Sequence, residues 1–478
     1  MKVETSVIEL RRDDVVKGAA ALLTVVVFLW ISATSPIQGQ ILGVVFLALV
    51  VWSLYPRRHL ESSILIMVIL SFFQVSLSLE EFVNSILSTY GGSGLWIILS
   101  GFILAKAMEE SGLARRIALW IATSLGGNPN NILLSVAIAN LAIAPLSPST
   151  TAKAFLLLPI CAGLVEAFGV EKGRSNYGAA VMLMAMAANN ICSTAFLTAT
   201  VPNPISADYI RESSGLDLGW LGWLRMAFPL TLLLLVVSWL VCARMYRPEV
   251  RKTSESLRSI ENLKEGLGRM SRGEKIVAVF FCIAMLLWIT DRFHGLNAGL
   301  ISLLLSLTLF IPGVRVMELR GFSGEVPWGS IMLFAASMLL AKAVGRWRAL
   351  DPVAISVFNL FDLSKLNWML FVSLVVFVSM FLHIGFTSTT VYATVMMPLV
   401  ISLTQLQGLD IRLVALPVAF LTPVAVVLPV NTIPNIIFYS SGYFTQKQIV
   451  FYGLVTSLIS VVIVLLLGRP YWGLLGLL

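Results

Sequence analysis

Two short runs of hydroxyl side chains form the part of the sequence best suited to bind a small anion. The first is Ser149-Thr150-Thr151 with Pro159 downstream, and the second is Ser388-Thr389-Thr390 with Pro398 downstream. A helix that begins at such a run exposes unpaired N–H groups and a partial positive charge, which attract an anion. The hydroxyls add hydrogen-bond donors of small volume. We therefore predict that all six residues bind an anionic substrate.

A second pair of segments supplies further polar groups. Thr200-Val201-Pro202-Asn203 and Asn431-Thr432-Ile433-Pro434-Asn435 each place proline in an apolar stretch. Because proline lacks an N–H and interrupts a helix, it frees backbone carbonyl groups that can coordinate a cation. We expect Thr200, Asn431 and Thr432 to join the substrate site at these breaks. The alternative is that these residues only kink membrane helices and hydrogen-bond back to the backbone.

Two ionisable residues lie beside the hydroxyl runs. Lys153 follows the first run, and His383 precedes the second. A charge at membrane depth is costly, so ionisable residues there commonly serve function. We predict that both compensate the charge of the anion, with a buried core histidine as the alternative for His383. Lys106 and Lys342 lie near predicted helix ends and are expected to reach the membrane surface.

The composition places these segments in a membrane. Of the 478 residues, 58% are hydrophobic and 12% are charged, whereas about a quarter are charged in soluble domains. We predict an all-α polytopic membrane protein. The net charge of +8 is concentrated in short connections on one predicted side, which is typical of membrane orientation and not of nucleic-acid binding. The four cysteines stand alone and form no metal or redox motif.

The apolar runs predict about eleven transmembrane helices. They lie near residues 17–34, 38–55, 61–78, 94–108, 177–201, 224–245, 275–291, 297–313, 327–345, 412–438 and 448–467. The stretches 129–168 and 367–404 have polar, turn-forming middles that suit re-entrant hairpins enclosed by protein. Two complete spans joined by a loop are the alternative for each. With this count of spans, the basic connections place the N-terminus in the cytoplasm. Three basic residues then lie on the outer side of the membrane, against this rule: Arg346, Arg348 and Lys365.

Related fragments recur in the same order in the two halves of the chain. Residues 104–107, 149–151 and 200–203 recur at offsets of 236, 239 and 232 residues. The matched lysine-bearing helices are five predicted spans apart, so the two halves must have opposite orientations. Inverted repeats with broken elements are the architecture of secondary transporters.

This symmetry divides the chain into three parts. The first repeat, with the N-terminal helices, covers 1–245, a cytoplasmic linker covers 246–274, and the second repeat covers 275–478. Each repeat is expected to hold one hairpin and one broken helix. These are 129–168 and 177–210 in the first repeat, and 367–404 and 412–441 in the second.

These motifs resemble the divalent anion/sodium symporter family, which includes di- and tricarboxylate transporters and exchangers. The resemblance is carried by the two hydroxyl runs with their prolines, by residues 428–435 and by Ser441-Gly442-Tyr443. Gly112-Leu113 and Tyr471-Trp472 also fit. The resemblance implies a homodimer in the cell membrane, with a scaffold domain and a transport domain that moves like an elevator. It implies an anionic substrate and lipid as partners.

One departure from the family's motif concerns sodium. The family's two Ser-Asn-Thr motifs use asparagine to coordinate sodium, and the matching residues here are Thr150 and Thr389. Lys153 resembles the arginine in the Ser-Asn-Thr-Ala-Arg pattern of the exchangers, and a fixed ammonium there would replace a bound cation. We therefore hypothesise an exchanger without sodium. If the protein is sodium-coupled, Ser149, Thr150, Ser388 and Thr389 are the expected metal ligands.

Charge compensation favours exchange or cotransport. Each charge that crosses 100 mV corresponds to about 2.3 kcal/mol, so a dianion entering a negative cell faces about twice that cost. We expect a secondary active transporter of C4-dicarboxylates, 2-oxoglutarate or citrate that works by elevator-type exchange. A sodium-coupled symporter is the main alternative, and a metalloid or inorganic anion permease is another.

Other classes of protein lack support in the sequence. None of His59, His294 and His383 belongs to an HExxH zinc motif, and there is no GxSxG nucleophile elbow. We therefore expect no enzyme and no cofactor, with sodium as a coupling ion only in the symporter alternative. A channel would need a continuous pore, whereas inverted repeats favour occluded alternation.

Overall fold

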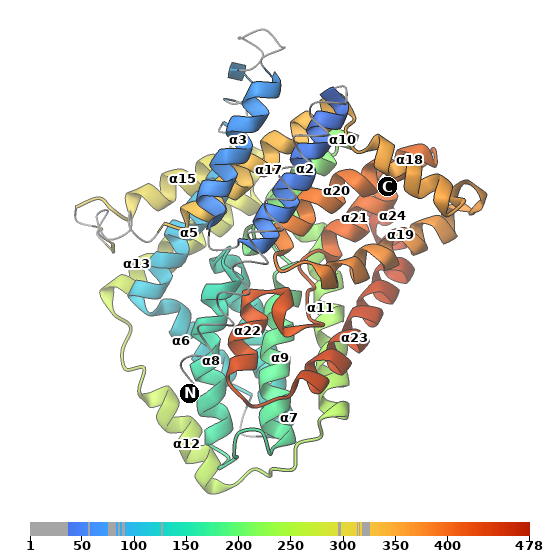
Figure 1. Ribbon diagram of the computed structural model, residues 1–478. Helices are drawn as coiled ribbons and strands as arrows, with labels where there is room; N and C mark the ends of the chain where they lie inside the picture. Colours follow the sequence, from blue (N-terminus) through green and yellow to red (C-terminus); the bar gives the residue numbers. More distant parts are fainter. Residues whose placement is uncertain are drawn as a thin grey trace, which may run out of the picture.

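The computed structural model describes residues 37–55, 58–74, 83–84, 87, 91–125, 128–294, 298–312, 314, 316–317 and 326–478. The described part of the chain is helical and contains no strand (Figure 1). The predicted helix 17–34 lies outside the described residues, so the orientation of the N-terminus stays a prediction.

The helices before and within the linker include the predicted apolar runs near 38–55, 61–78, 94–108 and 224–245, to within several residues, together with further helices. They are α2 (Ile37–Leu54), α3 (His59–Gln74), α5 (Ser93–Ser111), α6 (Leu113–Ala122), α7 (Pro129–Ile143), α8 (Thr150–Glu166), α9 (Asn176–Cys192), α10 (Pro202–Ser214), α11 (Gly219–Met245) and α12 (Ser254–Glu265).

The helices after the linker are α13 (Arg272–Ile289), α14 (Asp291–His294), α15 (Ala298–Thr308), α17 (Trp328–Trp347), α18 (Asp351–Leu360), α19 (Trp368–Leu382), α20 (Thr389–Leu406), α21 (Arg412–Leu421), α22 (Ile433–Ser440), α23 (Gln446–Ile463) and α24 (Arg469–Leu474). A π-helical turn, Val464–Gly468, joins α23 to α24.

Short helices that the apolar runs did not predict include α6, α12 and α18. Gly112 ends α5 with a φ of 84°, a left-handed conformation that suits glycine, and α6 begins directly after it. Helix α12 lies in the predicted polar linker, and its residues Ser256 and Ile260 are buried. A search for long apolar runs does not find such helices because they are only 10 to 12 residues long.

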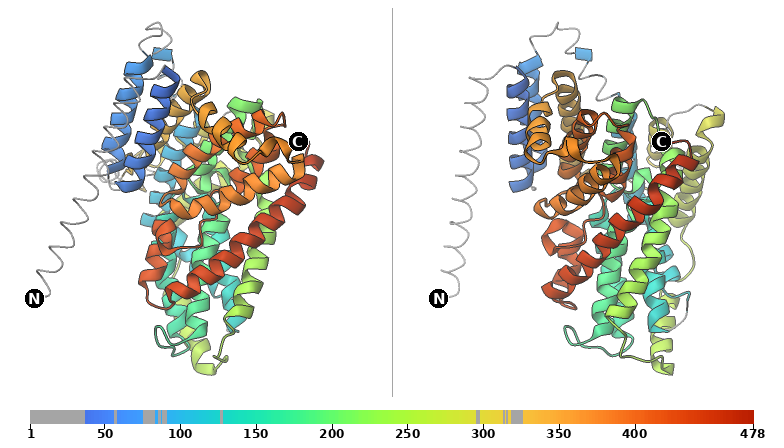
Figure 2. Two further views of the ribbon diagram at one scale, coloured as in Figure 1. Left: turned by 45° about the vertical axis from the view of Figure 1, so that its right-hand side comes forward. Right: turned by 90° about the vertical axis from the view of Figure 1, so that its right-hand side faces the viewer.

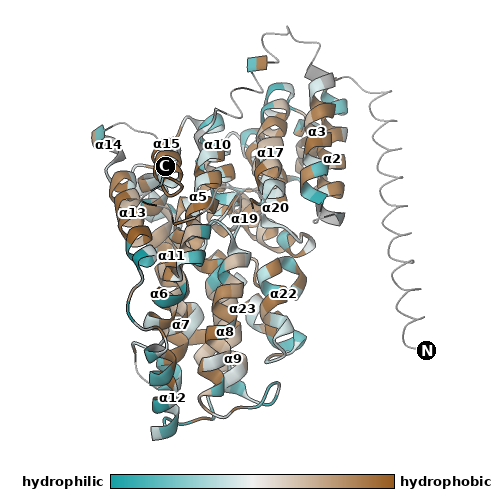
Figure 3. Ribbon diagram, turned by 90° about the vertical axis from the view of Figure 1, so that its left-hand side faces the viewer, coloured by the Kyte–Doolittle hydropathy of each residue, from teal (hydrophilic) through white to brown (hydrophobic). Residues whose placement is uncertain are grey.

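The lengths of the helices fit a membrane. Six helical segments among the described residues are long and apolar enough to span one: 129–146, 219–245, 328–347, 368–385, 389–406 and 446–474. Figure 3 shows hydrophobic colour along most of these helices, and hydrophilic colour on α12 at one end of the molecule. The total of about eleven spans stays a prediction.

Two apolar clusters organise the interior. The smaller is formed by α2, α3 and α17, with Val391 of α20, and the larger contains the remaining core helices. Figure 2 shows α2 and α3 together at one edge of the molecule. The predicted hairpins and broken helices all contribute to the larger cluster.

Both predicted hairpin regions consist of two helices around a break. Helices α7 and α8 flank a 3-10 turn, Ala144–Leu146, and α19 and α20 flank another, His383–Gly385. Each second helix is capped by the serine of its hydroxyl run. Ala152 N donates to Ser149 Oγ at 3.1 Å, and Val391 N donates to Ser388 Oγ at 3.4 Å. The structure therefore contains the predicted helix, turn and helix in both places.

The two predicted broken helices have the same form. Helices α9 and α10 are separated by the turn Leu197–Ala199, and α21 and α22 by the turn Pro429–Asn431. The helix after each break packs against the opposite half of the chain: α10 contacts α20 and α21, while α22 contacts α8 and α9 (Figure 1). This crossed packing brings both hairpins and both breaks into one body.

Candidate functional site

Lys153 ties the first hairpin to the first helix break. Its side chain is 3% exposed, and Nζ donates hydrogen bonds to Ser193 Oγ at 3.1 Å and to the Ala199 carbonyl at 2.9 Å. Asn189 Nδ2 donates to the Thr150 carbonyl at 2.9 Å, so α9 also holds the start of α8. The Lys153 side chain thus links α8 to the end of α9 and to the backbone of the first break.

Asn431 makes the equivalent connection in the second half. Its Nδ2 lies 3.3, 3.1 and 3.4 Å from the carbonyl oxygens of His383, Ile384 and Phe386. Its Oδ1 accepts a hydrogen bond from Leu428 N at 2.7 Å. The carboxamide therefore fills the space between the turn of the second hairpin and the second break.

Two asparagines bridge the helix breaks in the same way. Asn203 Nδ2 donates to the carbonyls of Ser193 at 2.7 Å and Phe196 at 2.8 Å. Asn435 Nδ2 donates to the carbonyls of Ala425 at 2.8 Å and Leu428 at 2.9 Å. In both halves the acceptors lie ten and seven residues before the asparagine. No role was predicted for these two side chains, although both are the last residue of the matched fragments 200–203 and 432–435, which was the available signal.

A hydrogen bond between asparagines also joins the two halves. Asn190 Nδ2 donates to Asn435 Oδ1 at 2.9 Å, and both residues are buried. The Nδ2 group of Asn435 donates to carbonyls of its own break, so its Oδ1 is the atom available to accept this hydrogen bond.

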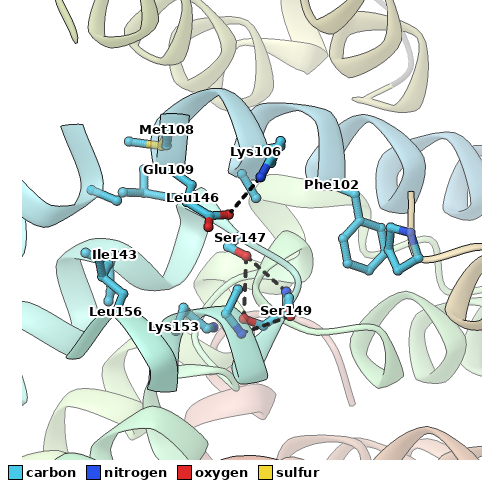
Figure 4. Close-up of a pocket in the computed structure, with 14 residues that line it drawn as sticks. Phe102, Lys106, Met108, Glu109, Ile143, Leu146, Ser147, Ser149, Lys153 and Leu156 are labelled. Carbon is cyan, nitrogen blue, oxygen red and sulfur yellow. Dashed lines mark hydrogen bonds and ion pairs between the residues drawn. The ribbon is translucent and has the colours of Figure 1, made fainter. Parts of the chain in front are cut away.

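A cavity of about 370 Å³ opens beside the first hairpin tip. Its polar and charged lining residues are Lys106, Glu109, Ser147, Ser149 and Lys153 (Figure 4). The remaining lining is apolar: Phe102, Ala105, Met108, Ala114, Ile143, Leu146, Ala152, Leu156 and Pro327. A mostly apolar cavity with a few convergent polar groups is the usual form of a small-molecule site.

The tip of the first hairpin gives this cavity its donors. Ser149 N donates to Ser147 Oγ at 3.1 Å, and Ser149 Oγ caps α8. The first turn of α8 therefore faces the cavity with a serine hydroxyl and the positive end of a helix. This is an arrangement that suits an anion.

The other predicted site residues are distributed over both halves. Thr151 is half-buried at the start of α8, and Thr200 is 5% exposed at the first break. Residues 388–390 are half-buried at the start of α20 and are not part of the cavity lining. Thr432 caps α22 by accepting from Asn435 N at 3.3 Å. A site shared by both hairpin tips therefore stays a prediction.

His383 belongs to the turn of the second hairpin. It is 3% exposed, and its ring centroid lies 4.3 Å from that of Tyr392. Its Nε2 has no hydrogen-bond partner among the described residues. The position next to the second tip agrees with the sequence, and a role toward the anion stays a prediction.

Comparison with known proteins gives the family. A model described as the sodium:sulfate symporter transmembrane region matches residues 16–478. A protein described only as a membrane protein from Cupriavidus necator is 23% identical over 477 residues, covering 96% of this chain and 92% of the relative. The sodium-dependent dicarboxylate transporter SdcS of Staphylococcus aureus strain USA300 is 27% identical over 403 residues, covering 79% of this chain and 76% of the relative.

A solved structure supports the fold. The YdaH transporter of Alcanivorax borkumensis superimposes with a TM-score of 0.53 and 13% identity, over 83% of this chain and 88% of that one. The expected family, the multi-pass membrane class and the expectation of a transporter that is not an enzyme are confirmed. Because the family model covers nearly the whole chain, this protein belongs to the sodium:sulfate symporter family of membrane transporters.

Proposed function

We propose that this protein exchanges small divalent organic anions, such as C4-dicarboxylates, 2-oxoglutarate or citrate, without sodium. The carrying observation is the buried Lys153 ammonium, which donates to Ser193 Oγ and to the Ala199 carbonyl at the first break. A sodium ion at this position would need these same oxygen atoms as ligands. A fixed positive charge there stabilises an anion at the neighbouring tip and requires no ion from solution.

Asn431 supports the same proposal in the second half. Its amide approaches three carbonyls of the hairpin turn, and these are the oxygen ligands that a second cation would need. In this proposal, N–H donors of the chain occupy both positions at which a cation could bind. The substrate site would then move back across the membrane only with a second dianion bound. The electrical cost of about 2.3 kcal/mol per charge at 100 mV then cancels between the two directions.

The substrate site in this proposal combines both hairpin tips and both breaks. It contains the two hydroxyl runs together with Thr200, Asn431 and Thr432, while Lys153 and His383 compensate charge. The crossed packing of α10 on α20 and of α22 on α8 supports this arrangement. We further propose two inverted repeats, 1–245 and 275–478, a cytoplasmic linker 246–274, a cytoplasmic N-terminus and a homodimer that works as an elevator.

A sodium-coupled symporter is the second candidate, because the relative SdcS is described as sodium-dependent. Proteoliposomes loaded with succinate separate the two. We expect uptake of labelled succinate that depends on internal dicarboxylate and is unchanged when choline replaces sodium. Uptake that collapses without sodium while internal succinate is present contradicts exchange and favours the symporter.

The hydroxyl runs give a prediction for affinity. Changing Ser149, Thr151, Ser388 or Thr390 to alanine should raise the KM for exchange about 10-fold or more, because a hydrogen bond to a charged group contributes about 1.5–3 kcal/mol. The yield of folded protein should change little. Ser356→Ala, at an exposed serine of α18, is the matched control. Wild-type KM in all four variants would remove these residues from the site.

A further inference from the structure

The cavity beside the first hairpin has a charged wall that the proposed function does not use. Lys106 and Glu109, both on α5, line the cavity opposite Ser147, Ser149 and Lys153. Figure 4 shows the Glu109 carboxylate between Lys106 and the serines. The Lys106 side chain is 21% exposed and lines this cavity, and its predicted position near the membrane surface stays a prediction.

Two ion pairs that Lys106 forms within α5 are long. Its Nζ lies 3.8 Å from Glu109 Oε2 and 3.9 Å from Glu110 Oε1. Pairs of this kind on one helix contribute about 0.3–0.5 kcal/mol, so an incoming carboxylate can compete for the ammonium. The Glu109 side chain is 66% exposed and can turn toward water when a substrate displaces it.

Glu109 brings a negative charge to the cavity beside the Lys106 ammonium. The ammonium can pair with a substrate carboxylate only when the Glu109 carboxylate has moved away. Glu110 forms a similar ion pair with Lys106 but is not a lining residue, so the two carboxylates differ in their contact with the cavity.

The counterpart of Lys106 in the second half is Lys342 on α17. Its electrostatic neighbours include Glu212 and Asp208 of α10, and α10 packs against α17.

We propose that Lys106 is a docking residue for dicarboxylates on one side of the membrane only, and that Glu109 competes with the substrate for it. This inference rests on the proposed dicarboxylate exchange. The wall of the cavity includes Ala114, next to Arg115 and Arg116, two basic residues of a connection that the proposed topology places in the cytoplasm. Lys106 thus binds one carboxylate of the dianion at the cytoplasmic opening, and the tip with Lys153 binds the other.

The test compares the two faces of the membrane. Inverted and right-side-out vesicles from a host without its own dicarboxylate carriers are loaded with succinate, and the KM for labelled succinate is measured in each. Lys106→Met should raise the KM about tenfold in inverted vesicles and less than about twofold in right-side-out vesicles, since charged contacts of this kind govern capture of a charged ligand. Lys106→Arg should retain the wild-type KM.

The two carboxylates provide the matched pair of variants. Glu109→Gln should lower the KM several-fold in inverted vesicles, while Glu110→Gln, which loosens a comparable ion pair outside the cavity, should leave it unchanged. An equal effect of Lys106→Met on both faces, or equal effects of the two glutamine variants, overturns the inference. If the wild type exchanges no dicarboxylate, the proposed substrate is wrong. If the wild type is active and Lys106→Met has the wild-type KM in both kinds of vesicle, only the docking role is wrong.

Discussion

Replacing Lys153 by alanine should reduce exchange by at least about 100-fold. The substitution removes two charge-assisted hydrogen bonds, to Ser193 Oγ and to the Ala199 carbonyl, each worth about 1.5–3 kcal/mol. It also removes the fixed charge beside the anion. The measurement is the initial rate of succinate counterflow in proteoliposomes, normalised to the amount of folded carrier.

Two comparisons separate this functional effect from damage to the fold. Lys106→Ala should reduce exchange less than Lys153→Ala, because Lys106 lines the cavity from α5, whereas Lys153 also holds the first break. Lys153→Ala should also gain sodium dependence, since its loss leaves the oxygen atoms of Ser193 and Ala199 available to a cation. Full sodium-free exchange in Lys153→Ala, or the opposite ranking of the two lysines, would assign Lys153 a structural role.

Some local signals coincide with helix starts. A serine that caps a helix and a proline that interrupts one act within a few residues, and helices begin at Thr150, Pro202, Thr389 and Ile433, beside such residues. The re-entrant form of the two hairpins stays a prediction. Short amphipathic helices are a different case. Helix α12 buries Ile260 against the rest of the protein, and only the tertiary contacts make that face favourable.

The sequence could not predict which side chains contact one another. Lys153 reaches acceptors 40 and 46 residues away, and no periodicity links positions so far apart. Asn431 was predicted to bind substrate, and the structure shows its amide directed at the carbonyls of residues 383–386. Proline marks the break that contains Asn431, whereas the partners of Asn431 depend on how the second hairpin packs.

Replacing Asn435 by alanine should strongly destabilise the protein. The change leaves the carbonyls of Ala425 and Leu428 without this donor, and each unpaired buried polar group costs about 1–3 kcal/mol. Water cannot replace the donor in the interior of a membrane protein. We expect a loss of about 2–6 kcal/mol in the free energy of unfolding, measured by denaturant titration in detergent micelles. Asn359→Ala, at an exposed asparagine of α18, should change it little.

The two asparagines at the breaks can be ranked by how much stability the protein loses when each is replaced, and this ranking tests the coupling between the two halves. Asn203 and Asn435 make the same two bonds within their breaks, but only Asn435 also accepts from Asn190 at 2.9 Å. Asn435→Ala should therefore cost more than Asn203→Ala. The excess should shrink when Asn190 is already alanine, because the bond between the halves is then gone in both backgrounds. Equal costs in every background would mean that each break is stabilised within its own half and that the bond between Asn190 and Asn435 contributes nothing.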